Sequence, residues 1–511
     1  MFPLGVPNQI SDASVDLLGV AYLSISIPFF VACILLENFI IFIILPPSNR
    51  PPHTARFADS ICSVGLGVLQ VLAARILFLQ WMEPLYTLIY DNLKVTSALS
   101  DSTKPFTWWA CLLIADFLYY WFHRLSHTIS WMWTTHAVHH SSEEYNLTTA
   151  LRQPALDFLA PSFLISSIMA ALLFPWPLFS AHATFNLLYQ FWIHTQLIPP
   201  LPLVETVFNT PSLHRIHHGR NIRALGKNYG AILIIWDRMF GTYEPEICGE
   251  DDPNTPLMYG IIPQLRSYNP IFANVHHFYH MLVIQTKWQK WWEVPFRHWT
   301  PKNAKCPEVS KKSKMNPMSK FDPTPPTLRW KVYALGQFTL LLVFVSIYLL
   351  FDDDDAISEF LFPDLDLGWG KAFIAITVFS VSLWTLSNVS SICTLGVEGT
   401  KSTRRSLLCS EGARHAFILL LLIVACLVPS STTDDQRLFL TIAAFYFILD
   451  VGFFFMLRTD LEEEEEVTSN IVFADTEALI CETLIGADMD DEVVEKKGVS
   501  NWTWYVAKKY Q

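Results

Sequence analysis

Hydrophobic residues occur along this chain in long runs that are separated by polar segments. A helix needs about 20 apolar residues to cross the hydrocarbon core of a bilayer, because each residue adds about 1.5 Å along its axis. Nine runs approach or exceed this length, which predicts an all-α fold, a polytopic integral membrane helical bundle. The predicted spans are residues 21–45, 59–80, 105–122, 155–176, 178–198, 328–350, 370–394, 413–429 and 437–457.

The composition supports a membrane protein. Hydrophobic residues make up 51% of the 511 positions, and charged residues make up only 16%, whereas about 25% is usual in soluble domains. The nine cysteines form no C-x-x-C pair, and several lie inside apolar runs, which indicates buried thiols rather than a disulfide framework. The net charge is −12, and no domain is broadly basic. The sequence therefore predicts no nucleic-acid partner.

Lys and Arg residues in the short loops predict the orientation of the spans, because cytosolic loops carry an excess of them. Arg50 and Arg56 follow the first run, whereas the first twenty residues contain neither Lys nor Arg. Nine spans then place the N-terminus in the lumen and the C-terminus in the cytosol. The segment His123–His140 and the polar region 199–327 would both face the cytosol.

Half of the sixteen histidines gather in three tight clusters. Spacings of three and four residues place side chains on one face of a helix, so each cluster predicts a face of imidazoles. Neutral imidazole is the commonest metal ligand. The clusters are His123-x-x-x-His127, His136-x-x-His139-His140 and His214-x-x-His217-His218.

The number of histidines indicates what the clusters bind. A structural zinc takes four ligands, so eight histidines are enough for two metal ions. Imidazole suits iron, zinc and copper alike, which leaves the metal open at this point. Two further classes of protein also stay open: a non-catalytic membrane protein with structural zinc, and a metal or proton transporter. Transport sites lie near the middle of the membrane, whereas these clusters lie at span ends and in loops.

The clusters, with "NYG" at 228–230 and "WDRMFGTYEPE" at 236–246, resemble the fatty acid hydroxylase/sterol desaturase superfamily of integral-membrane di-iron oxygenases. The resemblance covers about residues 115–245. It implies that the clustered histidines hold two iron ions at a cytosol-facing site in the endoplasmic reticulum membrane. The stretches "HHSSEEYNLTTALRQ" (139–153), "FNLLYQFWIHTQLI" (185–198) and "NTPSLHRIHHGRN" (209–221) are most similar to the branch of the superfamily that cleaves glyceryl ethers.

That branch implies a particular reaction. An alkylglycerol in the membrane would be hydroxylated by O₂ at the carbon next to the ether oxygen, with tetrahydrobiopterin as the electron source, and would give a fatty aldehyde and glycerol. The chain has neither the His-Pro-Gly-Gly segment of a fused cytochrome b5 nor a Rossmann glycine fingerprint, so no fused electron-transfer domain is expected. The alternative is another lipid oxidase of the superfamily, a sterol C4-methyl oxidase, C5-desaturase or fatty acid hydroxylase that uses cytochrome b5 electrons.

Other residues near the clusters are further candidates. The resemblance implies that His194, at the end of the fifth predicted span, is a ninth ligand, and the alternative is a helix-end histidine that faces headgroups. Asp116 shares a helical face with His123 and His127, and we expect it to orient an imidazole as a hydrogen-bond acceptor. The alternative for Asp116 is an ion pair between helices. Histidines in 276–280 fit an interfacial helix. Candidates for contact with a cofactor or a headgroup are Tyr145, Arg152 and Arg220.

These features divide the chain into five expected regions. They are N-terminal membrane spans at 1–104, a fatty acid hydroxylase-like catalytic domain at 105–250, a cytosolic or interfacial loop region at 251–327, C-terminal membrane spans at 328–460 and an acidic cytosolic tail at 461–511.

Overall fold

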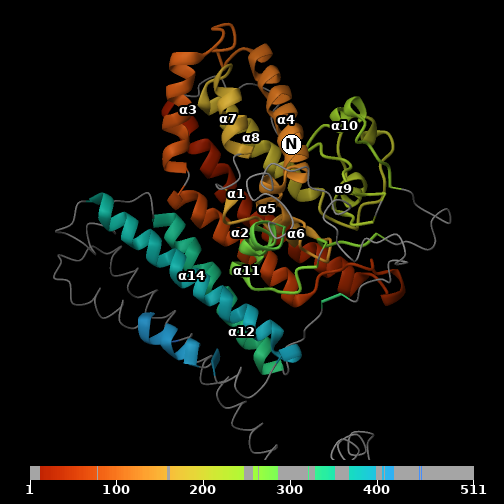
Figure 1. Cartoon of the computed structure of the whole chain (residues 1–511), viewed down its shortest axis with the longest axis vertical. Helices are drawn as coiled ribbons and strands as arrows, with labels where there is room; N and C mark the ends of the chain where they lie inside the picture. The colour runs from red at the N-terminus through yellow and green to blue at the C-terminus, as the bar shows by residue number, and fades with distance from the viewer. Residues whose placement is uncertain are drawn as a thin grey trace, which may run out of the picture. The chain divides into compact units, whose positions relative to one another are not determined.

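The computed structural model shows a protein built from α-helices and the loops that connect them (Figure 1). The described residues are 12–77, 79–157, 162–221, 223–246, 257–262, 264–285, 320–321, 328–351, 367–398, 406–407, 409–418, 448 and 451. Within them no β-strand occurs, and Phe208 and Leu233 form an isolated β-bridge. The prediction of an all-α fold is confirmed for this part of the chain.

Two described helices are long and apolar enough to cross a membrane, judged by length and composition. The first lies in α1 (Asp12–Phe39) and its π-helical continuation η1 (Ile40–Ile44), and covers Ser26–Ile44. The second covers Phe57–Ala74 in α2 (Phe57–Leu77). These two helices match the first two predicted runs. A third helix that the apolar pattern did not predict, α3 (Leu79–Leu93), follows directly.

The histidine-bearing segments lie on a second set of helices, and two of these are shorter than predicted. The runs 155–176 and 178–198 contain α7 (Ser162–Ala171) and α8 (Trp176–Trp192). At 1.5 Å per residue these helices are roughly 15 and 25 Å long, less than the 30 Å of a bilayer core. The other helices of this set are α4 (Pro105–Thr128), α5 (Ser130–His139), α6 (Leu147–Ala150), α9 (Pro211–His218), α10 (Ile235–Phe240) and α11 (Pro270–Tyr279), which continues as η5 (His280–Gln285).

An apolar core fixes the first of these helices. Cys111 and Leu118 of α4 are buried against Met132 of α5 and Phe179 of α8. Proline at N1 begins α4, where its missing N–H would have no helical partner. The helix ends at Thr128, and α5 begins two residues later at Ser130. The core therefore holds the two helices that carry the first two histidine clusters.

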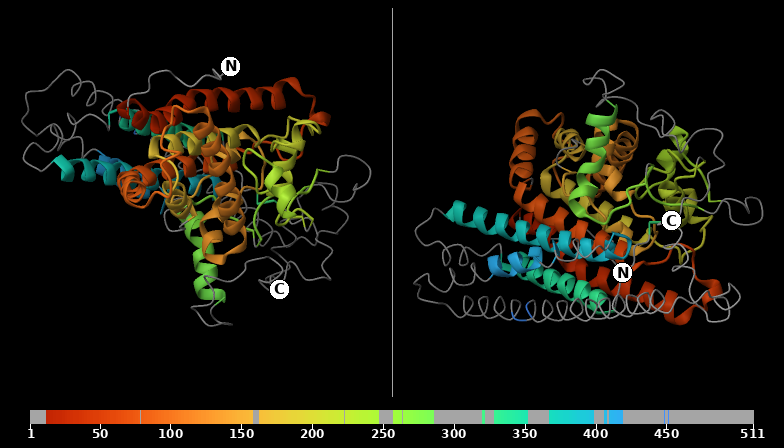
Figure 2. Two further views of the ribbon diagram at one scale, coloured as in Figure 1. Left: turned by 90° about the horizontal axis from the view of Figure 1, so that it is seen from above. Right: turned by 60° about the horizontal axis from the view of Figure 1, so that its bottom comes forward.

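The C-terminal helices α12 (Leu328–Phe351) and α14 (Leu367–Glu398) pack against each other, and α14 also packs against α2 (Figure 1 and Figure 2). Nearby, Arg414 and Glu411 form a buried ion pair at 2.7 Å. Of the predicted spans at 413–429 and 437–457, only residues 413–418, 448 and 451 are described, and the acidic tail lies wholly outside the described residues. The division into five regions stays a prediction.

Candidate metal centre

Nine histidines converge in two adjacent groups, and in each group the ligand atoms lie within 4.8 Å of one another. All eight clustered histidines are present, together with His194. Group A contains His123, His127, His136, His140 and His217, and group B contains His139, His194, His214 and His218.

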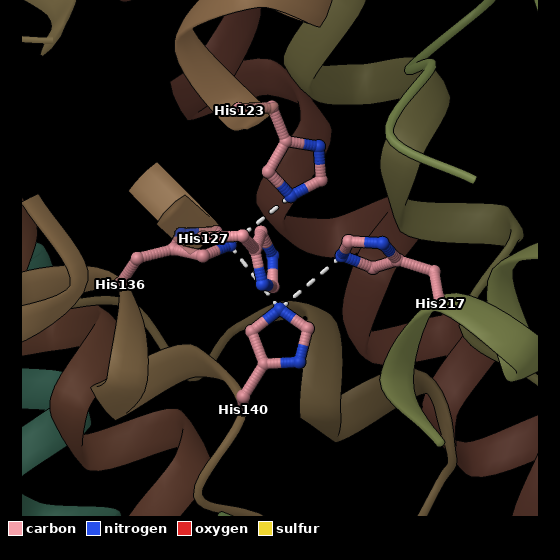
Figure 3. Close-up of side chains that lie close together, drawn as sticks. All are labelled: His123, His127, His136, His140 and His217. Atoms are coloured by element: carbon pink, nitrogen blue, oxygen red, sulfur yellow. Dashed lines mark hydrogen bonds between the residues drawn. The ribbon is translucent and has the colours of Figure 1, made fainter. Parts of the chain in front are cut away.

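Group A is assembled from three helices. His123 and His127 lie in the last turns of α4, His136 and His140 lie at the end of α5, and His217 comes from α9. Figure 3 shows the five rings pointing toward a common centre. The Nε2 atom of His136 lies 3.0 Å from that of His123 and 3.1 Å from that of His140. The Nε2 atoms of His140 and His217 are 3.2 Å apart.

Group B is assembled from α5, α9 and the residues that follow α8. The Nε2 atom of His194 lies 3.3 Å from that of His139, and 3.2 Å from those of His214 and His218. His194 is 1% exposed, so it does not face headgroups at a helix end. The structure thus places His194 where the prediction of a ninth ligand requires it.

The spacing predicted that the histidines of each H-x-x-H-H motif share one face. In the structure each motif is instead divided between the two groups. His136 and His140 belong to group A, whereas His139 belongs to group B. Likewise His214 and His218 belong to group B, and His217 belongs to group A. Residues four apart on a helix point the same way, whereas a residue three along is turned by about 60° to the other side. Each motif therefore supplies both groups.

Backbone carbonyls select which ring nitrogen faces each group. The Nδ1 atom of His139 lies 3.1 Å from the carbonyl oxygen of Arg152, and that of His194 lies 2.6 Å from the oxygen of Gln190. A neutral imidazole has a single N–H, and a carbonyl can only accept, so Nδ1 donates and Nε2 carries a lone pair. The carbonyls of Tyr229 and Lys227 act in the same way, at 2.7 and 2.9 Å from the Nδ1 atoms of His123 and His217.

This arrangement fits metal ions. The facing Nε2 atoms of His139 and His194 both carry lone pairs, so no hydrogen bond joins them and a cation between them would remove their repulsion. With metal–nitrogen bonds of about 2.1 Å, neighbouring ligand nitrogens lie about 3.0 Å apart in an octahedral shell and about 3.4 Å apart in a tetrahedral one. The observed separations span 3.0–3.3 Å. In addition, the buried Nε2 of His127 has no hydrogen-bond partner within the described residues.

The buried imidazoles are neutral, which is the form that binds a metal. Burial lowers the pKa of His139 to about 4. Burial, together with the neighbouring imidazoles, lowers the pKa of His217 and of His218 well below the usual value. A protonated imidazole has no free lone pair, so these shifts keep the ligand atoms available at neutral pH.

The "NYG" and "WDRMFGTYEPE" segments fix the carbonyl that orients His123. The carboxylate of Asp237 accepts hydrogen bonds from the backbone N–H groups of Tyr229 and Gly230, at 2.8 and 2.7 Å. A Cβ atom at Gly230 would lie 2.5 Å from the carbonyl oxygen of Leu233. Only glycine fits there without a shift of the loop. Asp237 belongs to a quoted motif, but its role was visible only in the structure.

Asp116 does not contact an imidazole directly. Its carboxylate accepts hydrogen bonds from the N–H groups of Ile232 and Leu233, from the indole of Trp236 and from the amide of Asn186, at 2.9–3.1 Å. Asn186 in turn accepts a hydrogen bond from Gln190, whose carbonyl orients His194. Asp116 is therefore connected to His194 through the side chains of Asn186 and Gln190. Its predicted role in orienting an imidazole stays a prediction.

The other flanking candidates have structural partners. Arg152 is 1% exposed and pairs with Asp59 at 3.1 Å, so it does not extend toward a cofactor or headgroup. The hydroxyl of Tyr145 donates to the carbonyl of Ile193 at 2.8 Å, and its ring stacks on His194. Arg220 is 7% exposed. The histidines of 276–280 lie outside both groups, and His277 contacts Trp133 of α5 with ring centroids 6.2 Å apart.

Comparisons with known proteins agree with this site. Residues 108–242, which span both groups, match the family model described as fatty acid hydroxylase. The alkylglycerol monooxygenase of Homo sapiens is 36% identical over 378 residues, which cover 70% of this chain and 77% of that protein. The alkylglycerol monooxygenases of Danio rerio and Caenorhabditis elegans are 38% and 35% identical, each over 60% of its own length. No solved structure matches the chain.

The helical fold and the histidine-rich centre, together with the family model, define a fatty acid hydroxylase-type lipid enzyme. Within this class, the alignment with the human protein is long enough and similar enough to assign a family. The chain belongs to the alkylglycerol monooxygenase family.

Proposed function

We propose that this chain is a glyceryl-ether monooxygenase, an oxidoreductase of lipid metabolism. One atom of O₂ is inserted into a C–H bond of the carbon next to the ether oxygen, and the other leaves as water. The hemiacetal that results breaks down to a fatty aldehyde and glycerol. The observation that carries the proposal is the pair of neutral histidine groups, in a chain that is 36% identical to the human alkylglycerol monooxygenase.

Groups A and B each hold one iron ion in this proposal. Five and four imidazoles are enough for two metal sites. When bound, the irons would activate O₂ for attack on an unactivated C–H bond. The histidines hold the metals, and the carbonyls of Arg152, Gln190 and Tyr229 fix the orientation of the rings. Burial of His139 and His218, each at most 6% exposed, keeps bulk water from the reacting carbon.

The two electrons that the reaction needs come from tetrahydrobiopterin in this proposal. The basis is the resemblance to the glyceryl-ether branch and the relatives that bear the alkylglycerol monooxygenase name. The pterin is oxidised by two electrons for each O₂ consumed, which balances the oxygen atom that leaves as water. No residue is assigned to the pterin.

A membrane location follows from the substrate and the helices. We place the enzyme in the endoplasmic reticulum as a multi-pass protein with the metal centre on the cytosolic side. Two described helices support spanning, and α1 exposes Phe29 and Leu35. Helix α11 supports lipid access: Ile271, Phe272, Val275 and Tyr279 are exposed and fall within an arc of about 100°. The opposite face, with Ala273 and His277, packs toward the histidine-bearing α5.

The direct test is aldehyde release from an alkylglycerol with a fluorescent chain. Membranes that contain the full chain, or its His139→Ala variant, would be assayed with and without tetrahydrobiopterin. Aldehyde that depends on the pterin and is lost in the variant supports the proposal. If well-expressed, iron-loaded protein releases no aldehyde, the ether-lipid activity is wrong. Oxidation of sterols or fatty acids with electrons from cytochrome b5 would then favour another lipid oxidase. Purified protein that contains zinc and consumes no O₂ would favour a non-catalytic protein with a structural metal.

A further inference from the structure

The first membrane helix carries a buried carboxylate. Glu37 is the only charged residue in the predicted span 21–45, and it is 3% exposed, whereas its neighbour Leu36 is 56% exposed. A carboxyl group within a membrane helix is costly unless it has partners, and such residues face the protein interior for a functional reason. Glu37 belongs to neither histidine group, and the apolar pattern gave no reason to select it.

The carboxylate binds two segments that are far apart in the sequence. Its Oε2 atom accepts a hydrogen bond from the backbone N–H of Leu147 at 2.8 Å. Its Oε1 atom accepts a hydrogen bond from the hydroxyl of Thr195 at 2.6 Å. Hydrogen bonds to a carboxylate are stronger than those between neutral groups. Glu37 thus joins α1 to the first residue of α6 and to the residue directly after His194.

Both segments lead to ligands of group B. Thr195 is bonded covalently to His194, and its carbonyl accepts a hydrogen bond from Arg215 of α9 at 2.8 Å. The helix α6 that begins at Leu147 is followed within two residues by Arg152, whose carbonyl lies 3.1 Å from the Nδ1 atom of His139. A shift at either contact of Glu37 would therefore move an imidazole of group B or the carbonyl that orients it.

Aromatic packing strengthens the same connection. The rings of Phe30 on α1 and Phe191 on α8 stack with centroids 4.1 Å apart, three residues before His194. The ring of Tyr145 stacks on that of His194 at 5.7 Å, and the amide of Gln196 donates to the Tyr145 carbonyl at 2.9 Å. The segments that Glu37 joins therefore form one packed layer around His194.

We propose that Glu37 is a positioning residue for the group B metal, so that the first membrane helix is part of the metal centre as well as an anchor. Group A depends on other partners, because the carbonyls of Tyr229 and Lys227 orient His123 and His217. Loss of Glu37 should therefore weaken one of the two metals selectively. This role rests on the proposed pair of metal sites, but not on the identity of the lipid.

The test is iron binding by purified full-length protein, measured by metal analysis and Mössbauer spectroscopy during titration with a chelator. Glu37→Leu is expected to lower the affinity of one iron about 10- to 100-fold, the usual effect of losing a partner that orients a ligand. Glu37→Gln should restore most of the binding, because its amide oxygen can accept from Leu147 and its NH₂ can donate to Thr195. Asn38→Leu is the matched control, since among the described residues the Asn38 side chain donates to the carbonyl of Ile34 in its own helix, at 2.8 Å.

The outcomes separate the two proposals. If Glu37→Leu binds both irons as tightly as the wild type, the positioning role is wrong, whatever the activity. If both irons weaken equally, Glu37 supports the fold in general and the selective role is wrong. If Glu37→Leu does not fold, Thr195→Val removes one contact and should give the same selective loss. Wild-type protein that binds no pair of metals contradicts the proposed metal centre itself.

Discussion

The imidazole ring of His140 stacks on that of His218, with centroids 4.3 Å apart and planes 22° from parallel. His140 belongs to group A and His218 to group B, so this contact joins the two groups. His140 closes the C-terminal end of α5 and His218 is the last residue of α9. The stack therefore holds the ends of α5 and α9 at a fixed separation. This separation sets the distance between the two proposed iron ions.

His194 provides a test of the nine-histidine arrangement. Its replacement by alanine removes a ligand of group B, so we expect loss of one iron and a fall in aldehyde formation of at least about 100-fold. His182→Ala, on the helix that His194 follows, is the control, because His182 is also buried but contacts Trp108, away from both groups. Full activity and two irons in His194→Ala would show that group B needs only His139, His214 and His218.

Gly230 tests the loop that orients His123. In Gly230→Ala the new methyl group would meet the Leu233 carbonyl at 2.5 Å, so we expect a loss of about 1–3 kcal/mol in the free energy of unfolding. The metal of group A should also bind more weakly, because the Tyr229 carbonyl moves with the loop. Gly412→Ala is the control, since a Cβ there meets nothing within 4 Å. Denaturant unfolding and metal analysis measure both effects, and an unchanged variant would contradict this account.

The pair of Asp59 and Arg152 is buried, so breaking it should be costly. Asp59→Ala leaves the guanidinium without its carboxylate partner, which typically costs about 3–5 kcal/mol of stability. The control is Asp101→Ala, which breaks an exposed pair with Lys104 and should cost less than about 1 kcal/mol. Thermal unfolding in detergent compares the two variants. Equal small losses would mean that Arg152 finds another partner when Asp59 is removed.

The exposed face of α11 should affect access of the lipid. Phe272→Ser and Val275→Ser remove apolar side chains that are 46% and 40% exposed. Together they are expected to raise KM for an alkylglycerol in vesicles by at least roughly 10-fold, because a factor of 10 corresponds to about 1.4 kcal/mol and full burial of one such side chain contributes about 1.5–3 kcal/mol. kcat should stay the same. Leu203→Ser, at a site 85% exposed, is the control. Unchanged KM would exclude α11 from the lipid path.

The metal-free protein should lose stability in acid. The pKa of His139 is lowered to about 4 in the folded state, whereas an unfolded histidine titrates near 6.5. Between these values the unfolded chain binds more protons, so the folded state weakens as the pH falls from about 6.5 to about 4. Each such histidine adds about 1.4 kcal/mol per pH unit in this window. Denaturant unfolding from pH 7.5 to 4.5 measures this slope, which His139→Gln should reduce. A slope of the opposite sign would contradict the buried neutral state.

The helical class and all nine histidines of groups A and B could be predicted from the sequence, and His194 was predicted through the family resemblance. A helix satisfies its backbone hydrogen bonds within its own segment, so long apolar runs in a bilayer predict helices. Helix α2 begins and ends within three residues of the predicted limits, whereas α1 begins nine residues before its predicted start. The spacing of His123 and His127 fixed their common direction, because residues four apart share a helical face. The family could also be predicted from the sequence, through motifs between His123 and Glu246 that overlap the matched residues 108–242.

The tertiary structure was needed to show which histidines share a group. His139 and His140 are neighbours in the chain, yet they belong to different groups, because successive residues of a helix point about 100° apart. The hydrogen-bond partners of Glu37 and Asp116 could not be predicted from the sequence either. Leu147 and Thr195 are 110 and 158 residues from Glu37. Contacts over such distances leave no periodic signal in the sequence, because they depend on how whole helices pack.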